Sequence, residues 1–233
     1  MAGRMRAVLL CAAMACVTAT GCAATGSLVR SLGHHPAGGS RGPLTGTMLS
    51  ALVPTPAGFS LDRSSSSDSG GKVATPVPGS SGTSGISCAS WWAGTGYFGP
   101  GTVAYTTRNY TGPKQVTLHI GINVYPSGTG AGVYTMSVQL QRRCLHFSYL
   151  DKDGVRYAVS ARLGPSAGAG DHSQEVDATE TAPDGTVFTT QTTYVDVGDA
   201  LVAATETGSA DATVSRATVP LAAIVAGLRS AGY

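Results

Sequence analysis

The amino-acid sequence predicts an α+β domain, in which an antiparallel sheet has a few helices packed on one face and a single disulfide. Three observations lead to this prediction. Many segments alternate apolar and polar residues, short Gly-containing turns separate them, and helical spacing is confined to a few places. The expected order of a helix, a strand, a helix, a run of antiparallel strands and a final helix is typical of this class.

The composition favours an exported, strand-rich protein over a cytosolic enzyme. Only 12% of the 233 residues are charged, and 32 are Gly. The length suffices for one domain with a sizeable core. Arg4 and Arg6 belong to an N-terminal segment that we expect to be removed, and without them the formal charge of +2 falls to zero. A nucleic-acid partner is therefore not predicted.

The first helix is expected at residues 44–53. Apolar residues recur at every fourth position from Leu44 to Leu52, Thr45 or Thr47 can cap its N-terminus, and Pro54 stops it.

Residues 62–85 are rich in Ser, Gly and Pro. Such a segment buries little apolar surface, so we expect a mobile loop inside the domain. Any ligand site is then expected on the folded face and not in this loop.

The clearest strand is residues 115–125, where apolar residues occupy every second position. Residues 131–144 fit both a helix and a strand; we favour a helix that ends near Cys144. Residues 145–150 and 155–163 then form a hairpin, whose turn contains Gly154 at a position suited to positive φ.

The C-terminal part continues with a Gly-rich loop at 164–173 and strands at 175–181, 186–197 and 200–207. A final helix is expected from the apolar face formed by Leu221, Ile224, Val225 and Leu228. Thr218 is its candidate cap, and Pro220 falls in the expected first turn.

Cys22 is the most informative single residue. It follows Arg4, Arg6 and an uncharged apolar stretch at residues 7–17, which is too short to span a bilayer. The run Ala-Thr-Gly-Cys at 19–22 resembles the bacterial lipobox, although Ala19 stands where Leu is commoner. We expect a signal peptide at 1–21, lipidation of Cys22, and a flexible tether at 22–43. The alternative is an ordinary signal peptide with a Cys near the cleavage site.

Cysteine usage agrees with export. Cys11 and Cys16 would leave with the signal peptide, and Cys22 would carry lipid. Cys88 and Cys144 then form an even pair in a disulfide-permissive compartment. A bridge between them is worth about 4 kcal/mol on the chain-entropy model. A metal site or a nucleophilic thiol is the alternative, but no His has a ligand spacing from either Cys.

Trp91 and Trp92 follow Cys88 closely and are the two tryptophans of the chain. Two large aromatic side chains beside a disulfide indicate local core packing, or else a face turned to a ligand.

The charges are unevenly distributed along the chain. Residues 22–164 contain eleven Arg and Lys against four Asp and Glu, and residues 165–233 contain two against nine. Either strands from the two parts pair their charges across the sheet, or an acidic face is turned to a cationic ligand or partner.

Enzyme motifs are incomplete in this sequence. Ser69 and Lys72 have the Ser-x-x-Lys spacing, without a downstream Ser-Asp-Asn or Lys-Thr-Gly. Residues 164–170 lack the Gly-Lys-Ser/Thr ending of a phosphate loop. Asp151 and Asp153 lack the further acids of a calcium loop. We therefore expect no catalytic activity, no cofactor and no metal.

From residue 44 onward, the chain resembles the extracellular sensor domains of mycobacterial membrane kinases of the PknH type and related actinobacterial lipoproteins. The motifs that carry this resemblance are Met-Leu-Ser-Ala-Leu-Val-Pro at 48–54, Pro-Ala-Gly-Phe at 56–59, Cys-Ala at 88–89, Cys144, and Val-Gly-Asp-Ala-Leu-Val at 197–202. The resemblance implies a compact α+β domain at 44–233 with a cleft for an unidentified ligand. Those kinase domains carry two disulfides and this one can form a single bridge, so we carry no signalling role over.

The hypothesis is a non-catalytic lipoprotein held at the extracytoplasmic face of the cell membrane by its lipid anchor. Its domain would bind a small molecule or an envelope component, and Trp91 and Trp92 are the candidate contact residues. The alternatives are a structural envelope protein without a specific ligand and an envelope hydrolase.

Overall fold

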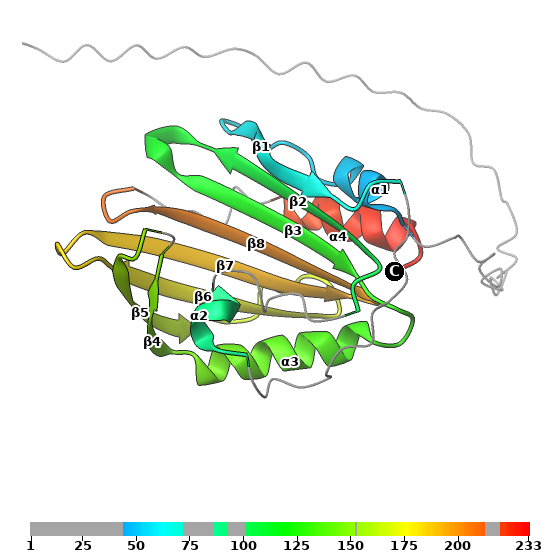
Figure 1. Cartoon of the computed structure of the whole chain (residues 1–233). Coiled ribbons are helices and arrows are strands. Elements are labelled where there is room, and N and C mark those ends of the chain that lie inside the picture. Colours follow the sequence, from blue (N-terminus) through cyan, green and yellow to red (C-terminus); the bar gives the residue numbers. More distant parts are fainter. Residues whose placement is uncertain (1–43, 72–85, 93–100, 152, 213–219) are drawn as a thin grey trace, which may run out of the picture. The chain divides into compact units, whose positions relative to one another are not determined.

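The computed structural model describes residues 44–71, 86–92, 101–151, 153–212 and 220–233. Eight strands in this part of the chain form one sheet, with the order β1-β2-β3-β8-β7-β6-β5-β4, and every neighbouring pair is antiparallel. Figure 1 shows the sheet with its helices. The strands are β1 (Ser60–Asp68), β2 (Ala104–Thr111), β3 (Thr117–Val124), β4 (His146–Leu150), β5 (Arg156–Leu163), β6 (His172–Thr181), β7 (Val187–Val197) and β8 (Ala200–Ser209).

Four α-helices accompany the sheet within the described residues: α1 (Gly46–Ala51), α2 (Cys88–Trp92), α3 (Gly130–Arg143) and α4 (Leu221–Ser230). A short 3-10 turn, η1 (Pro113–Gln115), connects β2 to β3. No helix in these ranges is long and apolar enough to cross a membrane.

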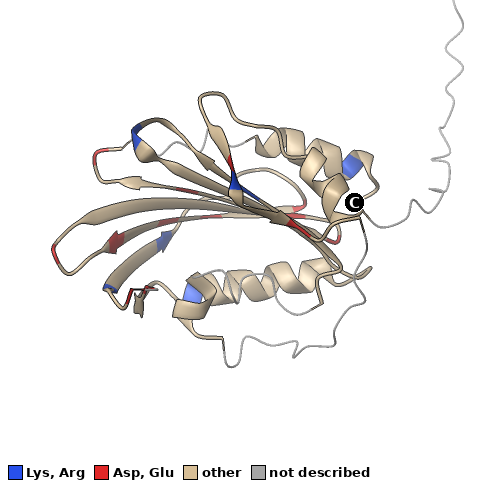
Figure 2. Ribbon diagram, turned by 45° about the horizontal axis from the view of Figure 1, so that its top comes forward, with Lys and Arg blue, Asp and Glu red and all other residues tan. Residues whose placement is uncertain are grey.

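The helices pack on both faces of the sheet, so the expectation of helices on one face is wrong. Alternate residues of β8 enter two different cores: Val202 and Ala204 face the core that contains α1 and α4, whereas Ala203 faces the core that contains α2 and α3. Figure 2 shows α3 and α4 on opposite sides of the sheet. Part of the central strands is therefore covered on both faces. Residues 200–204 of β8, which are all apolar and buried, allow this.

The first core is aliphatic. Leu49 of α1 and Ile224 and Leu228 of α4 are fully buried against strand residues such as Ile120 and Ile122 of β3. This is the alternating face that predicted the strand at 115–125.

The second core contains the disulfide. Cys88 of α2 is bonded to Cys144, directly after α3, with a Cα–Cα distance of 5.4 Å. Cys144 and Trp91 pack together against Val159, Val176 and the other apolar residues of this face. The expected disulfide is confirmed, and it attaches a five-residue helix to a fourteen-residue one.

Helix α3 begins on the turn between β7 and β8. The Asp199 carboxylate accepts hydrogen bonds from the backbone amides of Gly128 and Gly130, both at 3.0 Å. A Cβ atom on Gly130 would lie 2.4 Å from the carbonyl oxygen of Gly198, so only Gly allows this approach. The Gly-Asp pair at 198–199 thus positions α3 over the sheet.

Most elements expected from the sequence are present. The helix at 44–53 is α1, capped by Thr45, whose hydroxyl accepts from the amide of Met48. The ambiguous segment 131–144 is helical, as we favoured. The strands after it correspond to β4 to β8, and Gly154 has φ +77° in the β4–β5 turn. Pro220 is the N-cap of α4 and not part of its first turn, and Thr218 lies outside the described residues.

Strand β2 and helix α2 were not expected from the sequence. In β2, the positions that alternate into the core include Thr106 beside Ala104 and Tyr110, so the pattern is not clearly apolar. Helix α2 spans five residues, too few for a helical period to show.

Strand β1 corrects the expectation of a mobile loop at 62–85. Asp62–Asp68 belongs to a strand paired with β2, with a register shift between Asp62 and Ser67. Polar interactions replace apolar burial here. The Asp62 carboxylate accepts from the hydroxyls of Ser64 and Ser65, which holds its pKa near 2. Residues 72–85 lie outside the described residues.

Asp68 links β1 to α1 through a side-chain hydrogen bond. Its carboxylate accepts from the Ser50 hydroxyl and from the Gly70 amide, each at 2.8 Å, and Arg108 lies 3.6 Å away. The Ser50 hydrogen bond is the main reason that the pKa of Asp68 is lowered.

We predict that Asp68→Asn lowers the free energy of unfolding at neutral pH by about 1 kcal/mol, the value of one such hydrogen bond. A lowered folded-state pKa means that the carboxylate stabilises the fold above its unfolded pKa. That stabilisation disappears as the pH falls through the folded pKa. Urea unfolding of both proteins should therefore converge in acid; an equal difference at neutral and acidic pH would contradict this.

We also predict that Cys88→Ser lowers the unfolding free energy by about 2–5 kcal/mol, since it removes a bridge between residues 56 apart. Denaturant unfolding with and without a reductant measures this. The wild type should move towards the variant when reduced, and a variant unaffected by the loss of the bridge would contradict the prediction.

Candidate functional site

A cavity of about 250 Å³ lies on the sheet face that carries α2 and α3. Strands β6, β7 and β8 form its floor, and α2 and β4 contribute one side chain each. We call it the threonine groove. Its lining residues are Trp92, Tyr149, Glu180, Thr190, Thr192, Tyr194, Thr205 and Thr207.

The floor of the groove is a ladder of threonine pairs. Thr190 lies opposite Thr207, and Thr192 lies opposite Thr205, in the register of β7 and β8. The two hydroxyl groups of each pair are 3.1 Å apart. These cross-strand hydrogen bonds fix the side chains on an already rigid sheet.

Glu180 is the one acidic residue among those that line the groove. One carboxylate oxygen accepts a hydrogen bond from the Thr190 hydroxyl at 3.2 Å, and the other accepts from the Tyr149 hydroxyl. Burial is the main cause of the raised pKa of Tyr149, and the Glu180 carboxylate raises it further. Tyr149 therefore keeps its proton and remains a donor to Glu180 at neutral pH.

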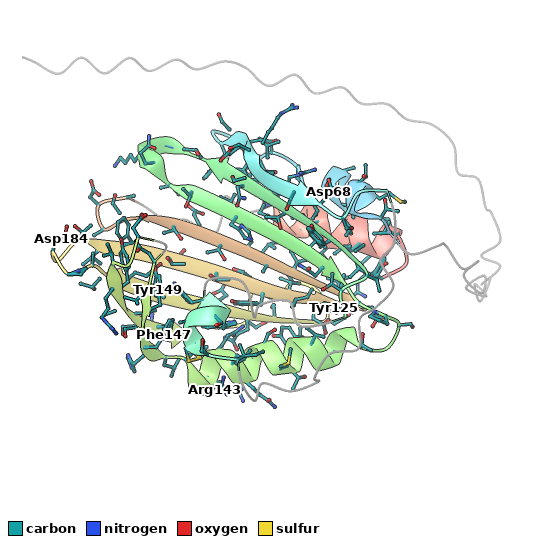
Figure 3. The ribbon with its side chains drawn as sticks, in the orientation of Figure 1. Asp68, Tyr125, Arg143, Phe147, Tyr149 and Asp184 are labelled. Atoms are coloured by element: carbon teal, nitrogen blue, oxygen red, sulfur yellow. A yellow bond between two sulfur atoms is a disulfide. The ribbon has the colours of Figure 1, made fainter. Side chains whose placement is uncertain are left out.

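Aromatic side chains form the wall above Glu180. Tyr149 stacks on Tyr157 with ring centroids 5.4 Å apart, and Phe147 lies edge-to-face with Trp92 at 5.8 Å. Figure 3 shows Phe147 and Tyr149 together on β4. The wall thus joins the hairpin β4–β5 to α2.

The two tryptophans have different environments. Trp91 is 1% exposed and belongs to the core, and its indole nitrogen has no hydrogen-bond partner among the described residues. Trp92 is half-buried and lines the groove. Of the two candidate contact residues predicted from sequence, the structure places Trp92 at the cavity and Trp91 behind it.

The polar surface continues from β8 onto β3 and β2. Thr205 lies opposite His119, which lies opposite Asn109. The imidazole Nδ1 of His119 and the Asn109 amide oxygen are 2.7 Å apart, and burial lowers the pKa of His119. His119 is therefore neutral at physiological pH and adds no positive charge beside the groove.

Two other hollows offer less to a ligand. One is formed by β5, β6 and β7 around Arg162 and Asp177, which pair with each other at 3.2 Å. The other lies beside Arg63 and Arg108 on β1 and β2. Neither has an aromatic residue in its lining.

The described residues contain no group of three or more potential metal ligands. His146 contacts Ser160 at 3.3 Å without a carboxylate on the imidazole, and His172 contacts Asp196 at 3.0 Å without a serine. Burial raises the pKa of Asp196. A Gly-x-Ser-x-Gly pattern occurs at residues 38–42, outside the described ranges, and no predicted strand precedes it, as a nucleophile elbow requires. We therefore find no assembled hydrolase site in the described part of the chain.

The acidic and basic parts of the chain occupy different strands of the sheet. The acidic C-terminal part supplies β6, β7 and β8, and strands from the basic part flank them on both sides. Arg162 and Asp177 pair across the two parts, whereas Arg108–Asp68 and Arg229–Asp171 each join residues of the same part. Figure 2 shows how thinly charges are spread over the sheet. Charge pairing across strands is thus only one contribution to the pattern.

Comparison with solved structures identifies a similar fold. The extracellular domain of PknH from Mycobacterium tuberculosis superimposes with a TM-score of 0.55 and 12% sequence identity, over 82% of this chain and 99% of that one. No protein-family model matches the sequence, and no curated protein matches it. The likeness supports the expected fold, and at this identity it shows the fold alone.

Apart from Trp92, the residues of the groove were not predicted from the sequence. A signal was present: Thr190 and Thr192 alternate on one strand, and Thr205 and Thr207 alternate on the next. This polar stripe marks the point at which the apolar core on this face of the two strands ends, although Thr190 and Thr192 are themselves buried. Cys22, the predicted lipidation site, lies outside the described residues.

Proposed function

We propose that this chain is a non-catalytic cell-envelope lipoprotein whose extracytoplasmic domain binds a ligand in the threonine groove. The observation that carries the proposal is the cavity of about 250 Å³ in which aromatic and hydrogen-bonding side chains converge. Binding sites in folded proteins combine these two kinds of lining.

Rigid elements hold the side chains that line the groove. Its floor belongs to the central strands, and the disulfide joins α2, which carries Trp92, to the end of α3. Side chains held by rigid elements bind with a smaller entropic cost than side chains on loops. The site is thus pre-formed, as ligand sites commonly are.

Cys22 and the disulfide between Cys88 and Cys144 support an extracytoplasmic location for the domain. The proposal includes a signal peptide at 1–21, a tether at 22–43 and a ligand-binding domain at 44–233. A disulfide is typical of exported proteins, and the similarity to an extracellular domain is compatible with that location. Two acyl chains on one residue suffice for stable anchoring.

One observation favours the alternative of a structural envelope protein without a specific ligand. The threonine hydroxyls pair with each other, and Glu180 accepts from two of its neighbours. A groove whose polar groups have internal partners is stable when empty. The following experiment separates the two functions.

We predict that Thr207→Arg, which places a long side chain in the groove, abolishes ligand retention without unfolding the domain. The purified domain is immobilised, incubated with a bacterial envelope extract, washed, and analysed by mass spectrometry for retained small molecules. Wild type should retain compounds that Thr207→Arg loses by tenfold or more. Circular dichroism confirms the fold of each protein.

The matched control is Thr181→Arg. Thr181 is exposed and follows Glu180 directly, so its side chain points to the opposite face of β6. This variant should retain the same compounds as wild type. If wild type, Thr207→Arg and Thr181→Arg retained the same compounds equally, or none, the groove would not be the binding site.

The anchor is tested separately. We predict that Cys22→Ala abolishes incorporation of a radiolabelled fatty acid and moves the domain from the membrane fraction to the soluble fraction, or leaves a longer precursor. Cys11→Ala is the control, because Cys11 would leave with the signal peptide. Labelling of the Cys22→Ala protein would refute lipidation at this residue.

A further inference from the structure

In each hydrogen bond around Glu180, the number of available hydroxyl protons decides which group is the donor and which is the acceptor. Glu180 is an acceptor, so Thr190 donates its single hydroxyl proton to Oε1 and Tyr149 donates its own to Oε2. The hydroxyl groups of Thr190 and Thr207 are 3.1 Å apart. With the Thr190 proton already used, Thr207 must be the donor in that contact.

Three hydroxyl protons of the groove are thus committed to interactions within the protein. What Thr207, Tyr149 and Glu180 still offer to a ligand is oxygen lone pairs, since a hydroxyl oxygen has two acceptor positions and a carboxylate has about four. This corner of the groove is therefore rich in acceptors. It matches a ligand group that donates hydrogen bonds.

The electrostatics point in the same direction. The described residues that line the groove include the Glu180 carboxylate and no Lys or Arg. The floor strands come from the acidic part of the chain, and the neighbouring His119 is kept neutral by burial. At this corner, a carboxylate or phosphate on a ligand would face the lone pairs of Glu180 and Thr207, and no Lys or Arg of the lining would compensate its charge.

The aromatic side chains of the groove also favour a positively charged ligand. Trp92 and Tyr149 line the same cavity as Glu180. The π-face of an aromatic ring attracts a cation, with Trp the most effective, and a desolvated site strengthens the attraction. Aromatic rings beside a carboxylate thus form a site for a positively charged nitrogen.

We infer that the threonine groove recognises a ligand through an ammonium group, carried on an alkyl chain or a sugar, which donates hydrogen bonds to Glu180 and Thr207 and packs against Trp92. An ammonium has three donors and no acceptor, so it complements this corner better than a neutral hydroxyl does. The inference deepens the proposed function and rests on it.

The test uses probes that differ only in the charged group. Glucosamine and glucose differ by an ammonium in place of a hydroxyl, and pentylammonium and 1-pentanol form the alkyl counterpart. Glucuronate is the anionic probe. Each is titrated into the ¹⁵N-labelled domain at slightly acidic pH, where the amines are protonated. The backbone amides of Thr190, Thr205 and Thr207 report binding.

At least one ammonium probe should shift these amides and bind tenfold or more tightly than its neutral partner. The sugar and alkyl arms then show which scaffold the groove prefers. Glu180→Gln keeps the shape and removes the charge, and it should weaken the ammonium probe tenfold or more. Asp177→Asn removes one charge from the opposite face of β6 and should leave binding unchanged.

Three results would overturn the inference. Equal binding of the neutral and ammonium probes would mean that the groove binds ligands without selecting a cation. Tighter binding of glucuronate would reverse the electrostatic argument. If no ammonium probe shifted the groove amides, the class would be wrong, while retention of envelope compounds by wild type and not by Thr207→Arg would still support the proposed function.

Discussion

The structure depends on the insertion of the last strand into the middle of the sheet. β8 lies between β3 and β7, so a segment near the C-terminus is paired on both edges and covered on both faces. Small residues make this possible: Ala200, Ala203 and Ala204 are almost fully buried. This position joins the basic and acidic parts of the chain in one sheet. It also places the acidic strands at its centre.

The threonine groove arises because the two faces of the central strands are covered to different extents. On the face of α1 and α4, apolar residues run along most of β3. On the other face, β7 and β8 change character along their length. Tyr194 and Ala203 lie opposite each other in the core under α3, whereas Thr192 and Thr205 follow two residues further on. On this face, the apolar core ends where the threonines begin, and the groove lies over the threonine part of the two strands.

Elements that bury apolar side chains were predictable from the sequence, whereas elements held by polar side chains were not. Strands with an apolar face, such as β3 and β5, were evident from their period of two. β1 was not, because its side chains are held by hydrogen bonds, such as those that Asp62 accepts from nearby serines. The placement of helices on both faces was also hidden. It requires knowing that β8 pairs with β3 as well as with its sequence neighbour β7. The pairing with β3 joins residues as far apart in the sequence as Thr117 and Thr207.

The candidate site was predictable only in part, for a related reason. Trp92 stood out because it is rare and close to a cysteine, and the disulfide does hold its helix against α3. Glu180 and Tyr149 were invisible as a pair, since they are separated by 31 residues and meet only because β4, β5 and β6 are consecutive neighbours in the sheet. Their contact decides the direction of the hydrogen bonds in the groove. The chemical character of the site thus comes from strand pairing, and no single segment of the sequence contains it.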